Sequence, residues 1–531
     1  MEKRFMQLER FSESKKAVLS NGIVCAIPFV FSKLWFLSWV SFVPLAACFL
    51  DNERVNAKGF SRLCFRFGFA FYFLGYVWLG ELYPFEYLGI GHATALLLLA
   101  LAMTVVPALH AGILAVAGYV CRRAVDKAPR FFRLLGFPCV FVLAEFLQSL
   151  GTFAFPWCRL FVTQSACPVL LQSASLFGSY FITYLILLVN ALLVRCGEKP
   201  SDNKKRCALA LVLFSANLVF GCVRVALTEY QYQKNDSYFS AVVLQGNYPY
   251  NAKKNDPVSS IYTRYISLID AALAARTTDI PTLILLPETA LPTNIENADS
   301  TYAKLLSSAA VRKQATIAAG AFSVTTHSEG DKSYGNSIFI FTPDGAMSEP
   351  YSKRHLVPFG EYLPYRGLFD RFLPMVSENA AFAVDLSPGQ GTVVQDTPCG
   401  RVGAIVCYES VFGDICRKSV SDGAEILLVA TNDSTFGSSQ ALRHHRAQAQ
   451  MRAIENNVPV LRAANTGISA LIAPNGVVVC QTEPDETAFL TDTLPYGTGR
   501  TLYNWIGDGI LWLLAGALLI IGIKTGRKSS V

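Results

Sequence analysis

The chain has 531 residues, of which 52% are hydrophobic and only 16% are charged, and its mean hydropathy is +0.35. Soluble domains average about a quarter charged residues, so this composition argues against a wholly water-soluble protein and points to a bilayer. The net charge of +7 is modest for this length, and it gives no case for a nucleic-acid partner.

Eight apolar stretches are predicted to cross a membrane, because roughly 20 apolar residues are needed to span ~30 Å of hydrocarbon. Seven of them precede residue 230, and the eighth lies near the C-terminus. The first two are short and are separated only by Ser32 and Lys33, which predicts a tight hairpin. The stretches are about 17–32, 34–50, 64–83, 93–120, 132–150, 168–194, 207–227 and 505–523.

Lysine and arginine are concentrated at the N-terminus, in the C-terminal tail and in the loops after the second, fourth and sixth stretches. The alternate loops, such as 84–92, nearly lack both residues. Because positively charged loops stay in the cytoplasm, both termini are expected there. We therefore expect a transmembrane domain of seven helices over 1–227, a domain outside the cytoplasm over 228–504, and an eighth helix with a cytoplasmic tail over 505–531.

The part over 228–504 is predicted to be an α/β domain. Short apolar, β-branched runs alternate there with helical stretches, and strands buried on both faces read as continuous apolar runs. About 270 residues are enough for a full core. Predicted strands cover 239–245, 282–288, 316–322, 336–342, 402–408, 425–431, 458–464 and 469–474, and predicted helices cover 258–276, 299–314 and 438–456.

Most of the fourteen cysteines lie in apolar runs, where cysteine behaves as a small hydrophobic residue. Those in the long polar part, among them Cys399, Cys407 and Cys480, match neither a metal site nor a disulfide framework, although a Cys399–Cys480 bridge stays open. His444 and His445 adjoin on a predicted helix, where packing or surface roles are expected rather than metal binding. No metal or other cofactor is therefore expected.

Three reactive side chains fall at comparable places in this domain. Glu288 ends the run TLILLPE, Cys407 ends the run VGAIVC, and Lys353 follows the hairpin-like stretch 336–350. Sites in open α/β sheets form beyond the carboxyl ends of strands. Glu288 and Cys407 are therefore expected at one edge, with Lys353 brought in by a loop.

These residue types make a complete set for acyl transfer. A carboxylate can take the thiol proton as a general base, and a fixed ammonium can stabilise the oxyanion of a tetrahedral intermediate. A helix beginning near Ser410 is expected to favour the thiolate of Cys407 through its dipole. Each residue alone has a plainer interpretation, as a core thiol, a solvent-facing carboxylate or a solvated basic residue. We favour catalysis because the three occur together.

The motifs LLPETALP, YSKRHLVPFGEYLP and GAIVCYES resemble the Glu, Lys and Cys motifs of the nitrilase, or carbon–nitrogen hydrolase, superfamily. Nearly the whole chain is similar to the membrane branch of that superfamily, the apolipoprotein N-acyltransferases, because FAFPW, LQGN and TND followed by FG also match. The resemblance implies an eight-helix transmembrane bundle with a nitrilase-like αββα sandwich in the periplasm. It also implies a multi-pass protein of the bacterial inner membrane, and a monomer is expected.

The resemblance implies a reaction and the residues that perform it. Cys407 is expected to be the nucleophile, Glu288 the general base and Lys353 the oxyanion-stabilising lysine. The family takes an acyl chain from a phospholipid, typically phosphatidylethanolamine, onto the cysteine as a thioester. It then passes the chain to the free amino group of the N-terminal diacylglyceryl-cysteine of an apolipoprotein. The expected partners are thus a phospholipid donor, a diacylated apolipoprotein acceptor and the membrane.

Three further residues receive supporting roles from the resemblance. Glu361 resembles a second glutamate that supports the site, and Tyr408 and Glu409 are expected to shape the pocket beside the thiol. The chain departs from the family at two places where tryptophan is frequent, near Lys254 and at Thr435. These departures bear on lipid contacts more than on the chemistry.

Two other interpretations stay open. A membrane-tethered amidase acting on a small amide would have no need for seven spans before its domain. A channel or transporter with a non-catalytic outer domain would carry charges scattered through its spans, and few are seen. Glu145, in the fifth stretch, is one of these charges, and its expected partner is Arg159. The segment 361–383 mixes aromatic and apolar residues, and it is expected to be a lid on the bilayer surface.

Overall fold

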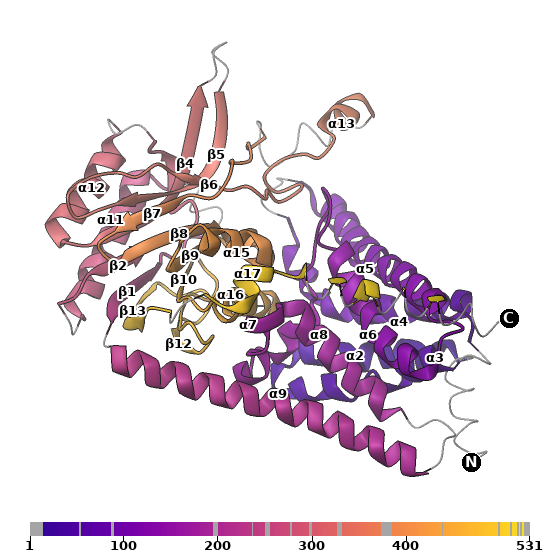
Figure 1. The fold of residues 1–531 in the computed structure, drawn as a ribbon. Coiled ribbons are helices and arrows are strands. Elements are labelled where there is room, and N and C mark those ends of the chain that lie inside the picture. The colour runs from indigo at the N-terminus through magenta and orange to yellow at the C-terminus, as the bar shows by residue number, and fades with distance from the viewer. Residues whose placement is uncertain are drawn as a thin grey trace. The chain divides into compact units, whose positions relative to one another are not determined.

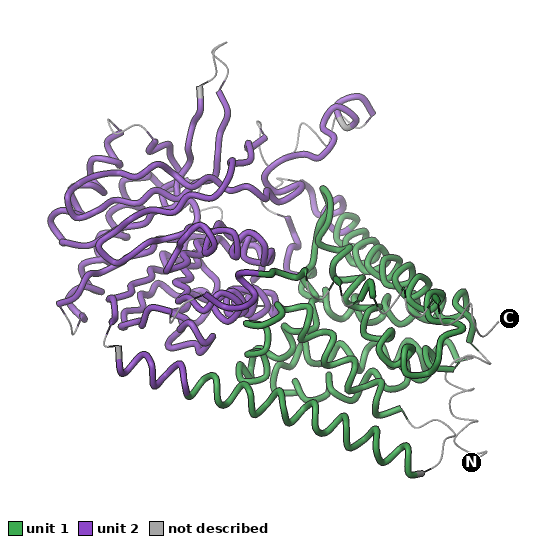
Figure 2. The backbone as a smooth tube through the Cα atoms, viewed as in Figure 1, with its two compact units in different colours: residues 1–80, 97–226, 506–531 green, residues 81–96, 227–505 purple. Residues whose placement is uncertain are grey.

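The chain forms two compact units, which are coloured separately in Figure 2. The helical unit comprises residues 1–80, 97–226 and 506–531, and the α/β unit comprises residues 81–96 and 227–505. The computed structural model describes residues 14–51, 55–85, 90–194, 200–235, 237–249, 255–276, 279–296, 300–326, 332–372, 385–437, 439–497 and 500–509, with a few residues between 512 and 524.

Each of the seven apolar stretches before residue 230 coincides with helix, because helices satisfy their backbone hydrogen-bonding groups internally (Figure 1). The eighth stretch, 505–523, lies partly outside the described residues. The helices are α2 (Lys15–Val30), η1 (Ser32–Trp39), α3 (Val43–Leu50), α4 (Ala57–Gly75), η2 (Val77–Leu82), α5 (His92–Ala124), α6 (Arg130–Leu147), η4 (Leu160–Gln164), η5 (Pro168–Leu171), α7 (Ala174–Phe177), α8 (Ser179–Leu193) and α9 (Pro200–Asn235).

Three helical segments of the described chain are long and apolar enough to cross a membrane, namely Ser32–Leu50, His92–Ala124 and Ser201–Lys234. A fourth span results if the adjoining segments Pro168–Phe177 and Ser179–Leu193, which are bent by 117°, form one broken span. The helices at the other predicted spans are shorter or carry more charge. The count of eight spans therefore stays a prediction.

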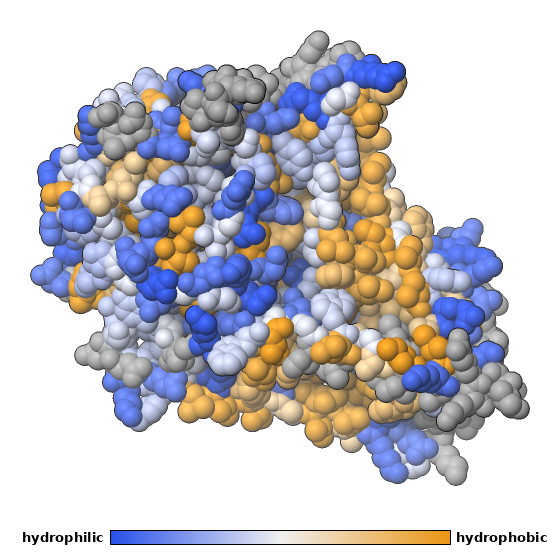
Figure 3. Space-filling model, turned by 45° about the horizontal axis from the view of Figure 1, so that its top comes forward, coloured by the Kyte–Doolittle hydropathy of each residue, from blue (hydrophilic) through white to orange (hydrophobic). Residues whose placement is uncertain are grey.

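Large apolar side chains lie on the outside of the helical unit (Figure 3). Leu97, Leu101, Val105 and Leu109 recur every four residues along α5, which places them on one helix face. Each is between 47% and 60% exposed. A continuous apolar face of this kind is unfavourable in water and suits contact with lipid.

Glu145 and Arg159 meet inside the helical unit, as their sequence positions predict. The Arg159 Nε lies 3.9 Å from the Glu145 Oε2, and both side chains are 3% exposed. Glu145 Oε1 also accepts hydrogen bonds from the Leu160 amide at 2.8 Å and the Thr183 hydroxyl at 3.0 Å. The guanidinium lies 4.1 Å from the ring centroid of Tyr180. These contacts give the carboxylate a structural role between α6 and α8.

The first sheet of the α/β unit has the order β13-β1-β2-β4-β5-β6, with β3 beside β4 (Figure 1). The strands β1, β2 and β4 are parallel, as expected for strands connected through helices. In contrast, β13 pairs antiparallel with β1, and β5 pairs antiparallel with β4. The elements are β1 (Tyr238–Gln245), α11 (Val258–Ala274), β2 (Thr282–Leu285), β3 (Leu291–Asn294), α12 (Thr301–Lys313), β4 (Thr316–Thr326), β5 (Lys332–Phe341), β6 (Tyr351–Ser352), α13 (Arg366–Phe372) and β13 (Ala488–Pro495).

The second sheet has the order β12-β11-β10-β9-β8-β7. Its central strands β8, β9 and β10 are parallel, so their carboxyl ends share one edge. Cys399 and Cys480, both in this part of the chain, are free thiols, and the disulfide that the sequence left open is not formed. The elements are β7 (Val394–Thr397), β8 (Gly400–Val406), η6 (Cys407–Val411), α15 (Gly413–Ser421), β9 (Ile426–Thr431), α16 (Gln440–Asn456), β10 (Val460–Ala464), β11 (Ala470–Ile472), β12 (Val478–Gln481) and α17 (Leu502–Ile506).

Alternate side chains of the first sheet enter two different cores, because successive residues of a strand point to opposite faces. Val243 and Leu285 pack with Leu428 of the second sheet. Val242, next along β1, packs instead with Tyr265 of α11. The helices α15 and α16 contact the second sheet. The expected αββα order is therefore found, with one core between the sheets.

Candidate active site

The three predicted catalytic residues all follow strands. Glu288 comes three residues after β2, Lys353 comes directly after β6, and Cys407 comes directly after β8. The structure brings these three positions together. The Lys353 Nζ lies 3.3 Å from the Glu288 Oε1, and the charges of both groups act on the Cys407 thiol.

Glu288 is held against the middle of β4. A Cβ added to Gly320 would lie 2.3 Å from the Pro287 carbonyl oxygen, 2.6 Å from the Thr289 nitrogen and 2.9 Å from the Glu288 Cα. Only glycine permits so close a backbone approach. The Glu288 Oε1 accepts a hydrogen bond from the Asn336 Nδ2 at 2.7 Å, which fixes the carboxylate.

Lys353 is a buried cation between two carboxylates. Its ammonium donates to the Glu361 Oε1 at 2.8 Å and to the Glu288 Oε1 at 3.3 Å. Burial alone would lower the pKa of the Lys353 ammonium, but the charges of Glu361 and Glu288 raise that pKa well above its usual value. Lys353 therefore stays protonated, which suits charge stabilisation and not base catalysis.

Glu361 lies where a support for the lysine is needed. Besides the lysine, its Oε1 accepts from the Asn336 Nδ2 at 2.9 Å, and its Oε2 accepts from the Val357 amide at 2.8 Å. Asn336 thus bridges Glu288 and Glu361, a role that was not predicted from the sequence. Its place at the start of the predicted strand 336–342 gave no signal of this role.

Cys407 has an unusual backbone conformation. Its φ is +54°, in the left-handed region that costs a non-glycine residue on the order of 1 kcal/mol and persists only where the surroundings fix it. Its carbonyl oxygen accepts from the Ser410 hydroxyl at 2.9 Å and from the His445 Nε2 at 3.1 Å. These two hydrogen bonds hold the sharp turn from strand to helix.

The resting sulfur of Cys407 is a thiol. Burial raises the pKa of this thiol, the charge of Glu288 raises it further, and the charge of Lys353 opposes that rise. The expectation of a dipole-stabilised thiolate is therefore wrong. The turn after Cys407 is a short 3₁₀ helix, and α15 begins only at Gly413. A base is needed for attack, and the Glu288 carboxylate is placed to serve as one.

Glu409 is fully buried and joins the loop after β6 to the turn after β8. Its Oε1 accepts from the amides of Arg354 at 2.7 Å and His355 at 3.1 Å, and its Oε2 accepts from the Val406 amide at 2.9 Å and the Tyr351 hydroxyl at 2.9 Å. Burial raises the pKa of the Glu409 carboxyl, although the hydrogen bonds from Val406 and Arg354 oppose that rise. The carboxylate thus holds in place the two segments that carry Lys353 and Cys407.

Tyr408, next to Cys407 in the chain, is buried in an aromatic cluster. Its ring centroid lies 5.3 Å from that of Phe412 and 5.9 Å from that of His355. Burial raises the pKa of the Tyr408 hydroxyl. Thr435, one of the departures from the family, lies in the turn that follows β9, whereas Lys254 lies outside the described residues.

The segment 361–383 is described as far as Phe372. Its short helix α13 presents Leu368 and Phe372 to solvent, at 58% and 67% exposure. Arg366, at the start of this helix, pairs with Asp385. A short helix that exposes these two apolar side chains is compatible with the predicted lid.

A second polar network lies beside Cys407, and the sequence predicted only a packing or surface role for one of its members, His445. The Asp433 Oδ2 accepts from the Arg462 Nη2 at 2.7 Å, and its Oδ1 accepts from the Thr431 hydroxyl at 2.7 Å and lies 2.9 Å from the His445 Nδ1. Burial would raise the pKa of Asp433, but the charges of Arg462 and His445 bring that pKa below its usual value. The polar triplet TND, which begins with the last residue of the predicted strand 425–431, was the available signal.

This network includes a possible set of metal donors. The Cys407 Sγ, an Asp433 oxygen and a His445 ring nitrogen lie within 4.8 Å of one another. However, both ring nitrogens of His445 already face oxygen atoms, and the guanidinium of Arg462 lies against Asp433. A neighbouring cation and engaged donors disfavour a metal ion here.

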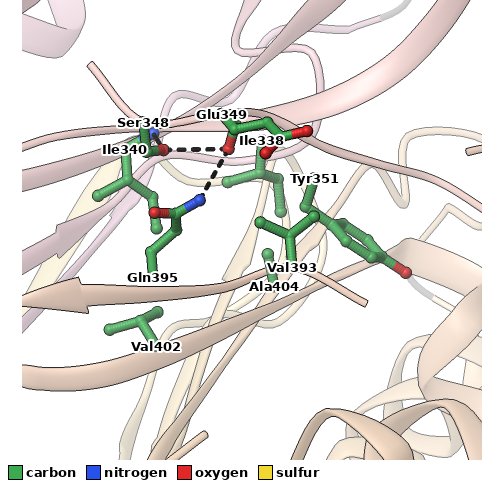
Figure 4. A pocket seen from close by; sticks show the side chains of 9 residues that line it. All are labelled: Ile338, Ile340, Ser348, Glu349, Tyr351, Val393, Gln395, Val402 and Ala404. Carbon is green, nitrogen blue, oxygen red and sulfur yellow. Dashed lines mark hydrogen bonds between the residues drawn. The ribbon is translucent and has the colours of Figure 1, made fainter. Parts of the chain in front are cut away.

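A small pocket lies elsewhere between the two sheets, among side chains of β5 to β8 and the loops between them (Figure 4). Its polar edge is closed by the Gln395 Nε2, which donates to the Glu349 carbonyl oxygen at 3.1 Å. None of the three predicted catalytic side chains lines this pocket. It is lined by Ile338, Ile340, Ser348, Glu349, Tyr351, Val393, Gln395, Val402 and Ala404.

Known proteins share both parts of this chain. The family model of the apolipoprotein N-acyltransferase N-terminal domain matches residues 21–192, and that of carbon–nitrogen hydrolase matches residues 243–502. The apolipoprotein N-acyltransferase of Geobacter metallireducens is 32% identical over 97% of this chain and 95% of its own. The apolipoprotein N-acyltransferase of Nostoc sp. is 26% identical over 91% of this chain and 93% of its own. A solved nitrilase-superfamily structure, Saccharomyces cerevisiae Nit3, is 19% identical over 49% of this chain and 90% of its own, with a TM-score of 0.38.

Proposed function

The chain belongs to the apolipoprotein N-acyltransferase family, and from that premise we propose that it transfers a fatty acyl chain from a phospholipid to apolipoproteins through a thioester on Cys407. The acceptor is the α-amino group of the N-terminal diacylglyceryl-cysteine, so the reaction completes lipoprotein maturation. The observation that carries the proposal is the close approach of Lys353 to Glu288, at 3.3 Å, beside the half-buried thiol of Cys407.

The first half of the reaction forms the thioester. Glu288 takes the thiol proton as the Cys407 sulfur attacks the ester carbonyl carbon of the phospholipid. Lys353, held by Glu361, stabilises the oxyanion of the tetrahedral intermediate. The carbon–oxygen bond then breaks, and the leaving lysophospholipid oxygen receives the proton from Glu288.

The second half passes the acyl chain to the amine. Glu288, again a carboxylate, takes a proton as the amine nitrogen attacks the thioester carbon. The carbon–sulfur bond breaks, and the Cys407 sulfur regains its proton from Glu288. The two half-reactions share one site, so ping-pong kinetics are expected. Water must be excluded from the thioester, or the enzyme would only hydrolyse lipid.

We further propose the location and donor of this reaction. Residues 1–227 form a seven-helix transmembrane domain of the bacterial inner membrane, residues 228–504 form the periplasmic catalytic domain, and residues 505–531 form an eighth helix and a cytoplasmic tail. The asymmetry of lysine and arginine between alternate loops supports this arrangement. Phosphatidylethanolamine is the proposed donor, the protein acts as a monomer, and the segment 361–383 lies on the bilayer surface.

The deciding experiment follows one labelled acyl chain. The purified full chain, Cys407→Ser and Cys407→Ala are incubated with labelled phosphatidylethanolamine, and intact mass and peptide mapping locate the label. The parent is expected to carry an acyl adduct on the Cys407 peptide. Adding a diacylated lipopeptide should discharge the adduct into an amide-linked third chain.

Cys407→Ala should give neither the adduct nor the amide-linked product. An amide product from folded Cys407→Ala, or an adduct-free thiol in the active parent, would overturn the thioester route. Phosphatidylglycerol with the same label tests the head group, and labelling of single-cysteine variants in 228–504 with a membrane-impermeant reagent tests the topology.

A further inference from the structure

The carboxylate of Asp433 is connected to both the sulfur and the backbone carbonyl of Cys407, through Thr431 and His445. Its Oδ1 accepts from the Thr431 hydroxyl at 2.7 Å, and that hydroxyl oxygen lies 3.2 Å from the Cys407 Sγ. The same Oδ1 lies 2.9 Å from the His445 Nδ1, while the His445 Nε2 donates to the Cys407 carbonyl oxygen at 3.1 Å. Sulfur and carbonyl of one residue are thus organised from a single point.

Thr431 cannot donate to both of its neighbours, because a hydroxyl has one proton and two lone pairs. Asp433 has the stronger claim on that proton. Its Oδ2 accepts from the Arg462 Nη2 at 2.7 Å and both side chains are fully buried, so the ionised carboxylate is compensated and acts only as an acceptor.

We propose that Asp433 is a positioning residue that takes the single hydroxyl proton of Thr431, so that Thr431 presents a lone pair to Cys407 and holds its sulfur as an oriented S–H donor until Glu288 removes the proton. His445 completes the device by fixing the Cys407 carbonyl. The inference rests on the proposed function, because it takes Cys407 as the nucleophile.

The contact from Thr431 to the Cys407 sulfur has a chemical use, because it keeps the thiol protonated. A thiolate is the form that reacts with oxidants and electrophiles, whereas a thiol resists them. The charged groups that act on the sulfur are Glu288 after β2, Lys353 after β6 and Asp433 after β9. Thr431 adds a neutral contact that favours the protonated form, so the nucleophile is activated only when substrate and base act together.

The test is whether Thr431→Val raises or lowers the rate of Cys407 alkylation, first in the parent protein and then in Asp433→Asn. Iodoacetamide alkylation of the Cys407 peptide is followed by mass spectrometry at pH 8 in the full-length protein, in detergent. Thr431→Val has nearly the same shape and removes the lone pair that accepts the S–H. Its Cys407 is expected to react about fivefold faster than that of the parent, as for the loss of one hydrogen bond to the thiol. Loss of polarity alone would slow the reaction, so the direction is diagnostic.

In the Asp433→Asn protein, the effect of Thr431→Val on the alkylation rate should be reversed. Arg462 only donates, so the asparagine oxygen must face it and the amide nitrogen must face Thr431. The amide then donates to Thr431, whose freed proton turns toward the sulfur. In this background Thr431→Val is expected to slow alkylation. Equal signs in both backgrounds, or slower alkylation of Thr431→Val in the parent, would overturn the proposal.

Two controls keep the outcome interpretable. Thr431→Ser retains the hydroxyl and should restore the parent rate of alkylation. If Asp433→Asn does not fold, the S–H stretching band in the infrared difference spectrum between parent and Cys407→Ala decides. A thiol that donates shows this band at lower frequency, whereas a thiol that does not donate shows it at the ordinary frequency. Alkylation needs no lipid, so it is independent of the acyl adduct. A missing adduct counts against the proposed function, whereas a change of the alkylation rate in the opposite direction counts against this inference.

Discussion

Gly320 packs against the backbone of Glu288 so closely that an added Cβ would lie 2.9 Å from the Glu288 Cα. The contact joins the middle of β4 to the segment that follows the neighbouring strand β2. The proposed general base is therefore positioned by the absence of a side chain on another strand.

We predict that Gly320→Ala displaces Glu288 and slows thioester formation about 10²-fold, because misplacement of a catalytic group by about 1 Å has effects of that size. Single-turnover acylation of Cys407 measures the loss, and thermal unfolding checks the fold. Gly112→Ala is the matched control, since a Cβ there would meet nothing within 4 Å. Acylation at the parent rate by folded Gly320→Ala would contradict the positioning role.

A second prediction concerns the partnership of Lys353 and Glu361. Lys353→Met should lower kcat about 10²–10³-fold, the usual effect of removing an oxyanion stabiliser. Glu361→Gln should lower kcat less, because the ammonium keeps Glu288 as a partner at 3.3 Å. If Glu361 acts only through the lysine, the double variant is no slower than Lys353→Met alone. A further fall in the double variant would show that Glu361 has an independent role.

A third prediction concerns stability. Glu409→Gln replaces one carboxylate oxygen with a donor, which then faces backbone amides that also donate. The free energy of unfolding is expected to fall by about 2–4 kcal/mol, since buried donors lose their acceptor. Tyr351→Phe removes a single hydroxyl from the same network and should cost about 1 kcal/mol. Chemical denaturation of both variants measures the difference, and equal losses would refute the network.

A fourth prediction follows from the lowered pKa of Asp433. In an unfolded chain an aspartate has a pKa of about 3.9, so the folded protein binds this proton less readily than the unfolded chain does. The stability that Asp433 contributes is complete above the unfolded value and is lost as the pH falls toward the folded value. The stability gap between the parent and Asp433→Asn should therefore narrow below about pH 4. Thermal unfolding from neutral to acidic pH checks this, and a constant gap would contradict it.

Much of the α/β unit could be predicted from periodicity and chain order. The runs 239–245 and 402–408 are buried on both faces, and each is found as a strand, β1 and β8. Short or half-exposed strands escaped prediction, such as β7 and β12, because four residues with mixed burial carry little pattern.

The candidate reactive residues stand out in the sequence more clearly than the residues that contact them. Cys407 and Lys353 are chemically conspicuous in their motifs, whereas Asn336 and Thr431 are ordinary polar residues whose importance lies in contacts across the fold. The thiolate expectation failed for a related reason. A dipole is a local property of sequence, but the burial that raises the pKa of the Cys407 thiol depends on the packed structure.

The antiparallel pairing of β1 with β13 sets Tyr238 opposite Pro495, so the sandwich starts and finishes on adjacent strands. A domain whose entry and exit points adjoin can be inserted into another chain without stretching either. The same property makes the domain suitable for transfer to another protein. Because both ends leave at one place, two short connections would suffice to attach the sandwich to a different anchor.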